Sequence, residues 1–316
     1  MNFFKLLPLP FMLVGCAAAP SYVPQASVVK APAATPTATA NVRELVRVTN
    51  DPAPELYVKV SPDATRALVT IINSEKSGPE SLSIVSYNLG KMGRKLVAGP
   101  YAAAGAWIDE KNIIYSYMKG SSPLLVKQSQ DSYGMRFVSP SPFGGFDTRP
   151  HVSKNNKIVF QTKLSGVAHI STVNSDGSDF TVYLEGESPK WNGSGSSIVF
   201  EKNISGSTNI FLLSLKDNSI TQLTSGTGYS GQPVWSPNGS HIAFISDMDG
   251  YFHLYVMRND GSNLIKLTSG ETNEAFPDWA SDDYIYFSSD AGGQEISDKN
   301  FMNWRFADIW KIKFSL

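Results

Sequence analysis

The stretch Pro233-Val234-Trp235-Ser236-Pro237-Asn238-Gly239 decides the fold, because shorter copies of it stand on both sides at a fixed distance. Pro189-Lys190-Trp191 precedes it and Pro277-Asp278-Trp279 follows it, which places tryptophans at 191, 235 and 279, two intervals of 44 residues. Internal repetition with a period of about 40–50 residues indicates a β-propeller or a solenoid. The chain is therefore expected to be a series of equivalent units.

Working outward, the same unit is found six times. Each has a first strand ending in Trp or Val, and a very apolar second strand whose third residue lies eight or nine positions later. The first strands end at Val60, Trp107, Val152, Trp191, Trp235 and Trp279, and the second strands include 67–69, 113–115, 158–160, 198–200, 242–244 and 285–287. Turn residues and two further strands follow in most units. Four antiparallel strands in a unit are typical of a propeller blade, so we predict an all-β, six-bladed β-propeller.

The last unit ends at Leu316 after its third strand, and its fourth strand is predicted at the other end of the chain. Leu45-Val46-Arg47-Val48-Thr49 is similar to the fourth strands that end at Thr224 and Thr268. Each of these threonines lies 11 residues before the next first-strand end, at Val60, Trp235 and Trp279. We therefore expect residues 42–49 to complete blade six and close the ring, which removes exposed strand edges. The propeller is assigned to residues 42–316.

Residues 1–15 are predicted to be a secretory signal, with Lys5 followed by a short apolar run from Leu6 to Val14. The run ends in Leu13-Val14-Gly15-Cys16, which resembles a bacterial lipobox, and Cys16 is the one cysteine of the chain. Cys16 is thus expected to carry a lipid that attaches the protein to a membrane; the alternative is an ordinary signal peptide. Residues 16–41 are rich in Pro, Ala and Thr and are predicted to be an extended tether.

Composition excludes one class of partner. The chain has 316 residues, a formal net charge of −1 and a pI near 6.4, which provide no basic surface for nucleic acid.

The repeats resemble a known family. Phe244 to Gly250, the turn at 235–239 and the ending Asn259-Asp260-Gly261 with Lys266-Leu267-Thr268 are similar to TolB-type six-bladed propeller repeats. The similarity is close in residues 187–290 and weakest in the first blade. It implies this fold and a place in the bacterial envelope, whereas the N-terminal α/β domain of TolB has no counterpart before the ring. The predicted location is the outer membrane, facing the periplasm.

Catalytic chemistry is not indicated by any motif. His169 and His253 occupy the repeat position of Asn209 and Asp308, which favours a structural hydrogen bond over a metal site. No His pair has zinc-binding spacing, and no Gly-x-Ser-x-Gly is present. We expect no enzyme activity, no metal and no cofactor, although carboxylates at the channel mouth leave a hydrolase or lactonase open.

Two unusually long connections break the repeat, at 139–147 and 291–306. Both join strands on the face of the disc that holds the 4→1 and 2→3 connections. They carry aromatic and arginine side chains of the kind enriched at interfaces, and these are the candidate partner-binding residues: Phe143, Phe146, Tyr229, Phe301, Trp304 and Arg305. We therefore predict a scaffold that binds another envelope protein, or alternatively a small-ligand or glycan binder in the channel. The tether is expected to leave on the opposite face, at Val42.

Overall fold

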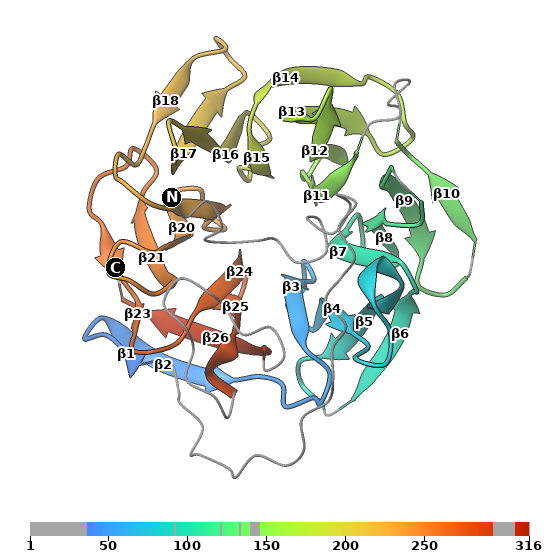
Figure 1. Ribbon diagram of the computed structural model, residues 1–316, viewed down its shortest axis with the longest axis horizontal. Coiled ribbons are helices and arrows are strands. Elements are labelled where there is room, and N and C mark those ends of the chain that lie inside the picture. Colours follow the sequence, from blue (N-terminus) through green and yellow to red (C-terminus); the bar gives the residue numbers. More distant parts are fainter. Residues whose placement is uncertain are drawn as a thin grey trace.

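A ring of four-stranded antiparallel sheets is the whole fold in the computed structural model, which describes residues 37–91, 93–120, 122–132, 134–139, 146–292 and 307–315. In these residues there are six four-stranded sheets, each with its first strand innermost and its fourth outermost (Figure 1), and one two-stranded sheet at the edge of the ring. The predicted six-bladed β-propeller is confirmed.

The blades follow one another in chain order, with the last one completed from the N-terminal end. Blade one has β3 (Glu55–Val60), β4 (Arg66–Ile72), β5 (Leu82–Asn88) and β6 (Arg94–Ala98), and blade two has β7 (Ala102–Trp107), β8 (Asn112–Tyr117), β9 (Leu124–Ser129) and β10 (Met135–Phe137). Blade three has β11 (Thr148–Val152), β12 (Lys157–Leu164), β13 (Val167–Asn174) and β14 (Thr181–Glu185), and blade four has β15 (Glu187–Trp191), β16 (Ser197–Ile204), β17 (Ser207–Ser214) and β18 (Ile220–Gln222). Blade five has β19 (Ser230–Trp235), β20 (His241–Ser246), β21 (His253–Arg258) and β22 (Ile265–Lys266), and blade six has β24 (Glu274–Trp279), β25 (Ile285–Ser289), β26 (Asp308–Phe314) and β2 (Val42–Arg47). Short 3₁₀ turns, η2 (Gly78–Ser81) and η3 (Asp290–Gly292), follow second strands in blades one and six.

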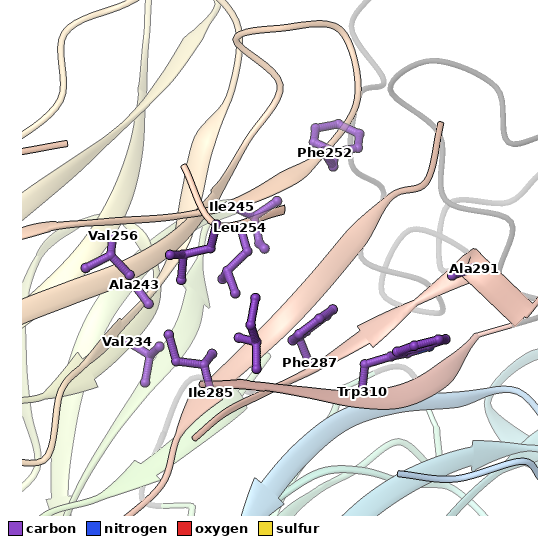
Figure 2. Close-up of a cluster of buried hydrophobic side chains, with 12 residues drawn as sticks. Val234, Ala243, Ile245, Phe252, Leu254, Val256, Ile285, Phe287, Ala291 and Trp310 are labelled. Atoms are coloured by element: carbon purple, nitrogen blue, oxygen red, sulfur yellow. The ribbon is translucent and has the colours of Figure 1, made fainter. Parts of the chain in front are cut away.

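The core lies between neighbouring blades, because the apolar second strands are buried on both faces. Figure 2 shows this packing between blades five and six, where side chains of the two sheets meet. From blade five come Val234, Ala243, Ile245, Leu254 and Val256, and from blade six Ile285, Phe287 and Trp310. Each blade thus needs a neighbour on both sides, which is why a ring must close.

Closure occurs as the 11-residue spacing predicts. Strand β2 pairs antiparallel with β26, with Leu45 opposite Ile312 and Arg47 opposite Trp310. Val42 and Leu45 pack against the core between blades five and six, whereas Val46 is 37% exposed. The closing strand is therefore buried on one face only.

The recurrent threonine at the end of the fourth strand makes the same hydrogen bond in three blades. Its hydroxyl accepts the backbone N–H at the start of the third strand, each time at 2.9 Å. These pairs are Thr49 with Ile309, Thr224 with Ile210 and Thr268 with Leu254. A buried N–H left without an acceptor costs free energy, so the repeat retains a hydroxyl here.

A further strand precedes the closing strand. Strand β1 (Thr37–Ala38) lies within the segment assigned to the tether, and it pairs antiparallel with β23 (Thr268–Ser269), beside blade five (Figure 1). Thr39 continues the contact, since its N–H and its hydroxyl donate to the carbonyls of Leu267 and Lys266. The described structure thus begins before residue 42.

The direction of β1 corrects the expected exit of the tether. β23 runs toward the face of the 4→1 connections, and β1 is antiparallel to it, so the chain comes from that face before it turns at 39–42 into β2. The sequence placed the exit on the opposite face because Val42 itself starts there. That expectation is wrong, because the chain reverses its direction between β1 and β2.

Candidate functional site

All six inner strands carry a β-bulge at the same position, around the central channel. The register of the first and second strands shifts once in every blade. One residue in each bulge has a positive φ, between 50° and 54°, and none is glycine: Tyr57, Ala104, Arg149, Ser188, Gln232 and Phe276. A bulge re-aims the side chains that follow it. The six equivalent bulges therefore set which residues line the channel, and we call these six residues the bulge layer.

Arg149 is the centre of a buried network on one side of the bulge layer. Its guanidinium donates to the Ser188 hydroxyl and lies 3.5 Å from a carboxylate oxygen of Glu201. The same carboxylate accepts the Tyr229 hydroxyl at 2.8 Å and the Gln232 backbone N–H at 2.6 Å. Arg149 is thus neutralised and held in place by blades four and five.

Aromatic rings fill the other side of this layer. Tyr57 and Phe276 stack with their ring centroids 3.8 Å apart. Between these rings and the Arg149 network an inner hollow of about 60 Å³ is left, lined among others by Ser188 and Lys190. That volume admits a few water-sized groups.

Two residues beyond each bulge, a second ring of side chains is more polar. Its members are Lys59, Ala106, His151, Lys190, Val234 and Asp278, and we call it the lysine layer. It borders an outer hollow of about 430 Å³ that opens among the hairpins joining first and second strands. Lys59 lines both hollows, His151 lines the outer one and Lys190 the inner one. The indoles of the repeated tryptophans form part of the outer wall.

Lys59 has a partner. Its ammonium lies 2.5 Å from one oxygen of Asp278, and the other oxygen accepts the backbone N–H of Val60 at 2.8 Å. This pair joins the first and the last blades across the point of closure. It also leaves Asp278 without capacity to neutralise a second cation fully.

Lys190 has no such partner. Among the residues that the structure describes, its side chain is half-buried and has neither a hydrogen bond nor an ion pair. Desolvation in the channel, followed by repulsion from Lys59, lowers the pKa of Lys190 to about 7. An amine without a hydrogen-bond partner in a hollow is available to a ligand.

His151 is neutral. Burial, together with the charges of Lys59 and Lys190, lowers its pKa well below the ordinary value. Its Nδ1 accepts the backbone N–H of Trp191 at 3.1 Å, so the neutral ring carries its proton on Nε2. His151 is therefore a hydrogen-bond donor without charge.

The acids at the starts of the inner strands belong to the framework. Glu274 accepts hydrogen bonds from the hydroxyls of Thr268 and Thr272 and lies 2.9 Å from Nδ1 of His253. Glu55 accepts from Thr49 and Tyr87 in the same way. The predicted structural role of His253 is confirmed by its contact with Glu274. No group of three or more His, Cys, Asp or Glu side chains suited to a metal is found within the described ranges.

The structure describes only some of the candidate residues that the sequence predicts. Cys16, Phe143, Phe301, Trp304 and Arg305 lie outside the described residues.

Phe146 and Tyr229 are the two candidates that the structure describes. Phe146 is half-buried, with the Lys163 ammonium 5.4 Å from its ring centre. Tyr229 is also half-buried, packs edge-on against Phe252 and directs its hydroxyl inward to Glu201. The structure thus makes Tyr229 part of the buried Arg149 network.

Sequence reasoning missed the lysine layer, although a signal was present. In Pro189-Lys190-Trp191 and Pro277-Asp278-Trp279 the middle residue, directly before the tryptophan, belongs to the lysine layer. A position that varies from Lys to Val to Asp within a constant frame is where repeats differ in function.

Comparison with known proteins agrees with this architecture. Residues 182–303 match the family described as the TolB beta propeller domain, and the TolB-type repeat is thereby confirmed. No curated protein matches the sequence.

Solved structures share the fold at low identity. TolB from Acinetobacter baumannii has a TM-score of 0.61 at 15% identity, with 80% of this chain covered and only 64% of that one. A putative TolB from Agrobacterium tumefaciens has a TM-score of 0.57 at 12% identity, covering 86% of this chain and 97% of that one. An oligogalacturonate lyase in complex with manganese has a TM-score of 0.55 at 11% identity, covering 90% and 97%. These likenesses show the fold.

Proposed function

Taking the TolB-type propeller repeat as the premise, we propose that this chain is a binding module of a bacterial cell envelope, without enzyme activity, that recognises another envelope protein. Cys16 is the proposed lipid attachment site, which anchors the ring to the outer membrane on the periplasmic side. In the described residues no helix is long and apolar enough to cross a membrane. The lipid would then be the means of attachment.

The observation that carries the proposal is the repeat itself, together with the rigid ring that it builds. Six blades locked by interblade cores present two faces of short connections, and binding residues concentrate on such loops when a rigid scaffold positions them. We assign the partner to the 4→1 face, through the predicted aromatic and arginine side chains. The Pro/Ala/Thr-rich composition before Thr37 predicts an extended chain, and 20 residues of it would reach about 60 Å, which would allow either face to meet a partner.

The experiment is a pull-down from cross-linked envelopes with three variants of the full chain. A loop-face variant replaces Phe143, Phe301 and Trp304 by Ala, a hairpin-face variant replaces the exposed Lys154 and Ser281 by Glu, and a third is Cys16→Ser. Loss of a central aromatic anchor costs about 2 kcal/mol or more, roughly thirtyfold in affinity, so the loop-face variant should lose its partner.

The other two variants serve as controls. The hairpin-face variant should keep the partner, and Cys16→Ser should move from the detergent phase to the aqueous phase or remain unprocessed. A partner lost only with the hairpin-face variant would assign binding to the opposite face. A partner lost with neither variant contradicts the protein-binding proposal.

A second candidate, a small-ligand binder in the channel, is favoured by one specific observation. Among the described residues, the Lys190 side chain has no hydrogen bond or ion pair, and it lines an inner hollow that shares Lys59 with the larger outer hollow. This candidate does not depend on a protein partner.

A further inference from the structure

The channel contains the cationic side chain of Lys190, which the packing of the ring does not require. The position of Lys190 is filled by Ala106 in blade two and by Val234 in blade five, with the same bulge before it. An apolar residue therefore satisfies the packing of this ring. Lys190 is a departure from the frame, and departures from a repeated frame mark sites of function.

The charges around Lys190 compensate it only in part, since Lys59 and Arg149 repel its ammonium and the acids that attract it, Asp278 and Glu201, have cationic partners of their own. Lys59 is paired with Asp278, and Arg149 is paired with Glu201. Lys154 stands at the rim of the outer hollow and adds a further positive charge. A half-buried ammonium without a counter-ion is unfavourable, and an entering anion would supply that counter-ion.

The number of charges limits the anion. One unpaired ammonium balances one negative charge, and a dianion would place its second charge near the carboxylate of Asp278. His151 adds a neutral N–H donor from the outer hollow, as its Nδ1 is occupied by the Trp191 amide. A carboxylate, with one charge and two acceptor oxygens, matches this set of donors.

The volumes of the two hollows indicate which part of a ligand each would hold. The inner hollow of about 60 Å³ has room for a carboxylate, and the outer hollow of about 430 Å³ has room for a body of one or two rings. Trp191 and Trp235 border the outer hollow, and aromatic walls suit a flat or sugar ring.

We propose that the channel binds a small ring-bearing carboxylic acid, with its carboxylate against the Lys190 ammonium in the inner hollow and its ring in the outer hollow. This inference rests on the second candidate function and is independent of the envelope partner. His151 and Lys59 border the same site, the first as a donor and the second as the wall shared by the two hollows.

Calorimetric titration of the purified chain tests the proposal. The probes are benzoate as an aromatic acid and glucuronate as a sugar acid, with benzamide and glucose as their uncharged counterparts, and inorganic phosphate. We expect one of the two acids to bind and to identify the body that the outer hollow takes, and the uncharged counterparts and phosphate to bind at least tenfold more weakly.

Variants locate the site. Lys190→Met should weaken the acid about tenfold or more, as expected for loss of a charged hydrogen bond, and Lys190→Arg should retain part of the affinity. Lys216→Met removes an exposed lysine that lines neither hollow and should change affinity by less than threefold. Melting curves establish that each variant is folded.

Several results would overturn the inference. These are no binding of either acid at 10 mM, equal binding of the uncharged counterparts, equal or tighter binding of phosphate, or unchanged affinity in folded Lys190→Met. Because the titration contains no partner protein, failure of the pull-down leaves this result unaffected, and the reverse also holds.

Discussion

At the scale of the residue, Lys190 destabilises the ring that holds it. Its pKa is lowered to about 7, so the folded chain disfavours the charged form of Lys190. In the unfolded chain the same side chain stays charged up to its ordinary pKa of 10.5. The resulting penalty is complete below pH 7 and disappears as the pH rises toward 10.5. A residue kept despite such a penalty is typical of a binding site.

Lys190→Met should therefore stabilise the protein in a pH-dependent way. At pH 6 the free energy of unfolding should rise by about 1–2 kcal/mol, since the half-buried ammonium is partly screened by water. The gain should shrink by pH 10. Urea unfolding at both pH values measures it, with the exposed Lys154→Met as the matched control. A variant no more stable than the wild type at pH 6 would contradict an unfavourable charge at Lys190.

The residues of the site could be predicted only in part from the sequence. The quoted motif located the inner strands, because Trp and Pro recur there, but the lysine layer lies at the variable position between them. Whether Lys190 meets Asp278 or stays alone depends on six bulges, and in none of them is the positive-φ residue a glycine that could reveal the bulge in the sequence. Conversely, the sequence predicts a surface aromatic at Tyr229, and only the long-range contact with Glu201 shows where its hydroxyl lies.

At the scale of the element, β2 and β1 stabilise the ring to different degrees. β2 contributes a whole edge of hydrogen bonds to β26 and packs Val42 and Leu45 against the core. β1 contributes two paired residues and the contacts of Thr39.

Three internal deletions should separate these contributions. Removing 17–36 should leave the melting temperature unchanged, and removing 17–41 should cost about 1–2 kcal/mol through the lost hydrogen bonds of β1. Removing 42–47 should cost about 3–6 kcal/mol, from the burial of two partly buried aliphatic side chains and a bare edge on β26. Differential scanning calorimetry distinguishes the three. Equal melting temperatures for the deletions of 17–36 and 42–47 would refute closure by β2.

At this scale the sequence predicts most of the architecture. Strand periodicity located every inner and second strand, and the 11-residue spacing located the closing strand. β1 could not be found, because Thr37-Ala38 lies in a low-complexity run and is held only by backbone pairing to β23. The exposure of Val46 could not be predicted either, because which face of β2 is buried depends on the blade that packs against it.

At the scale of the whole molecule, two buried acids lie where the ring closes. Burial raises the pKa of Glu55 to about 7, against the hydrogen bonds from Thr49 and Tyr87. Burial also raises the pKa of Asp308 to about 6, although Arg47 of the closing strand pairs with it. Both folded-state values exceed the ordinary carboxyl values of 4.5 and 3.8.

Stability should consequently fall as the pH rises through this window. The folded chain holds protons that the unfolded chain has released between about pH 4 and 7, so each acid costs up to about 3 kcal/mol by pH 8 relative to pH 4. Urea unfolding at pH 5, 6, 7 and 8 should show the decline, and Glu55→Gln should reduce it by about half. The exposed Glu44→Gln serves as the control. An equal decline in Glu55→Gln would exclude Glu55 as a cause.

The reversal between β1 and β2 determines how the ring responds to mechanical force. A pull transmitted along the chain before Thr37 acts first on the two residues of β1, whose contacts with β23 are far fewer than those that hold β2 to β26. β1 separates first and releases residues 37–41, about 17 Å of extended chain, while β2 stays paired. The load then reaches Val42, where β2 begins on the opposite face, and only after that does it act on the pairing of β2 with β26.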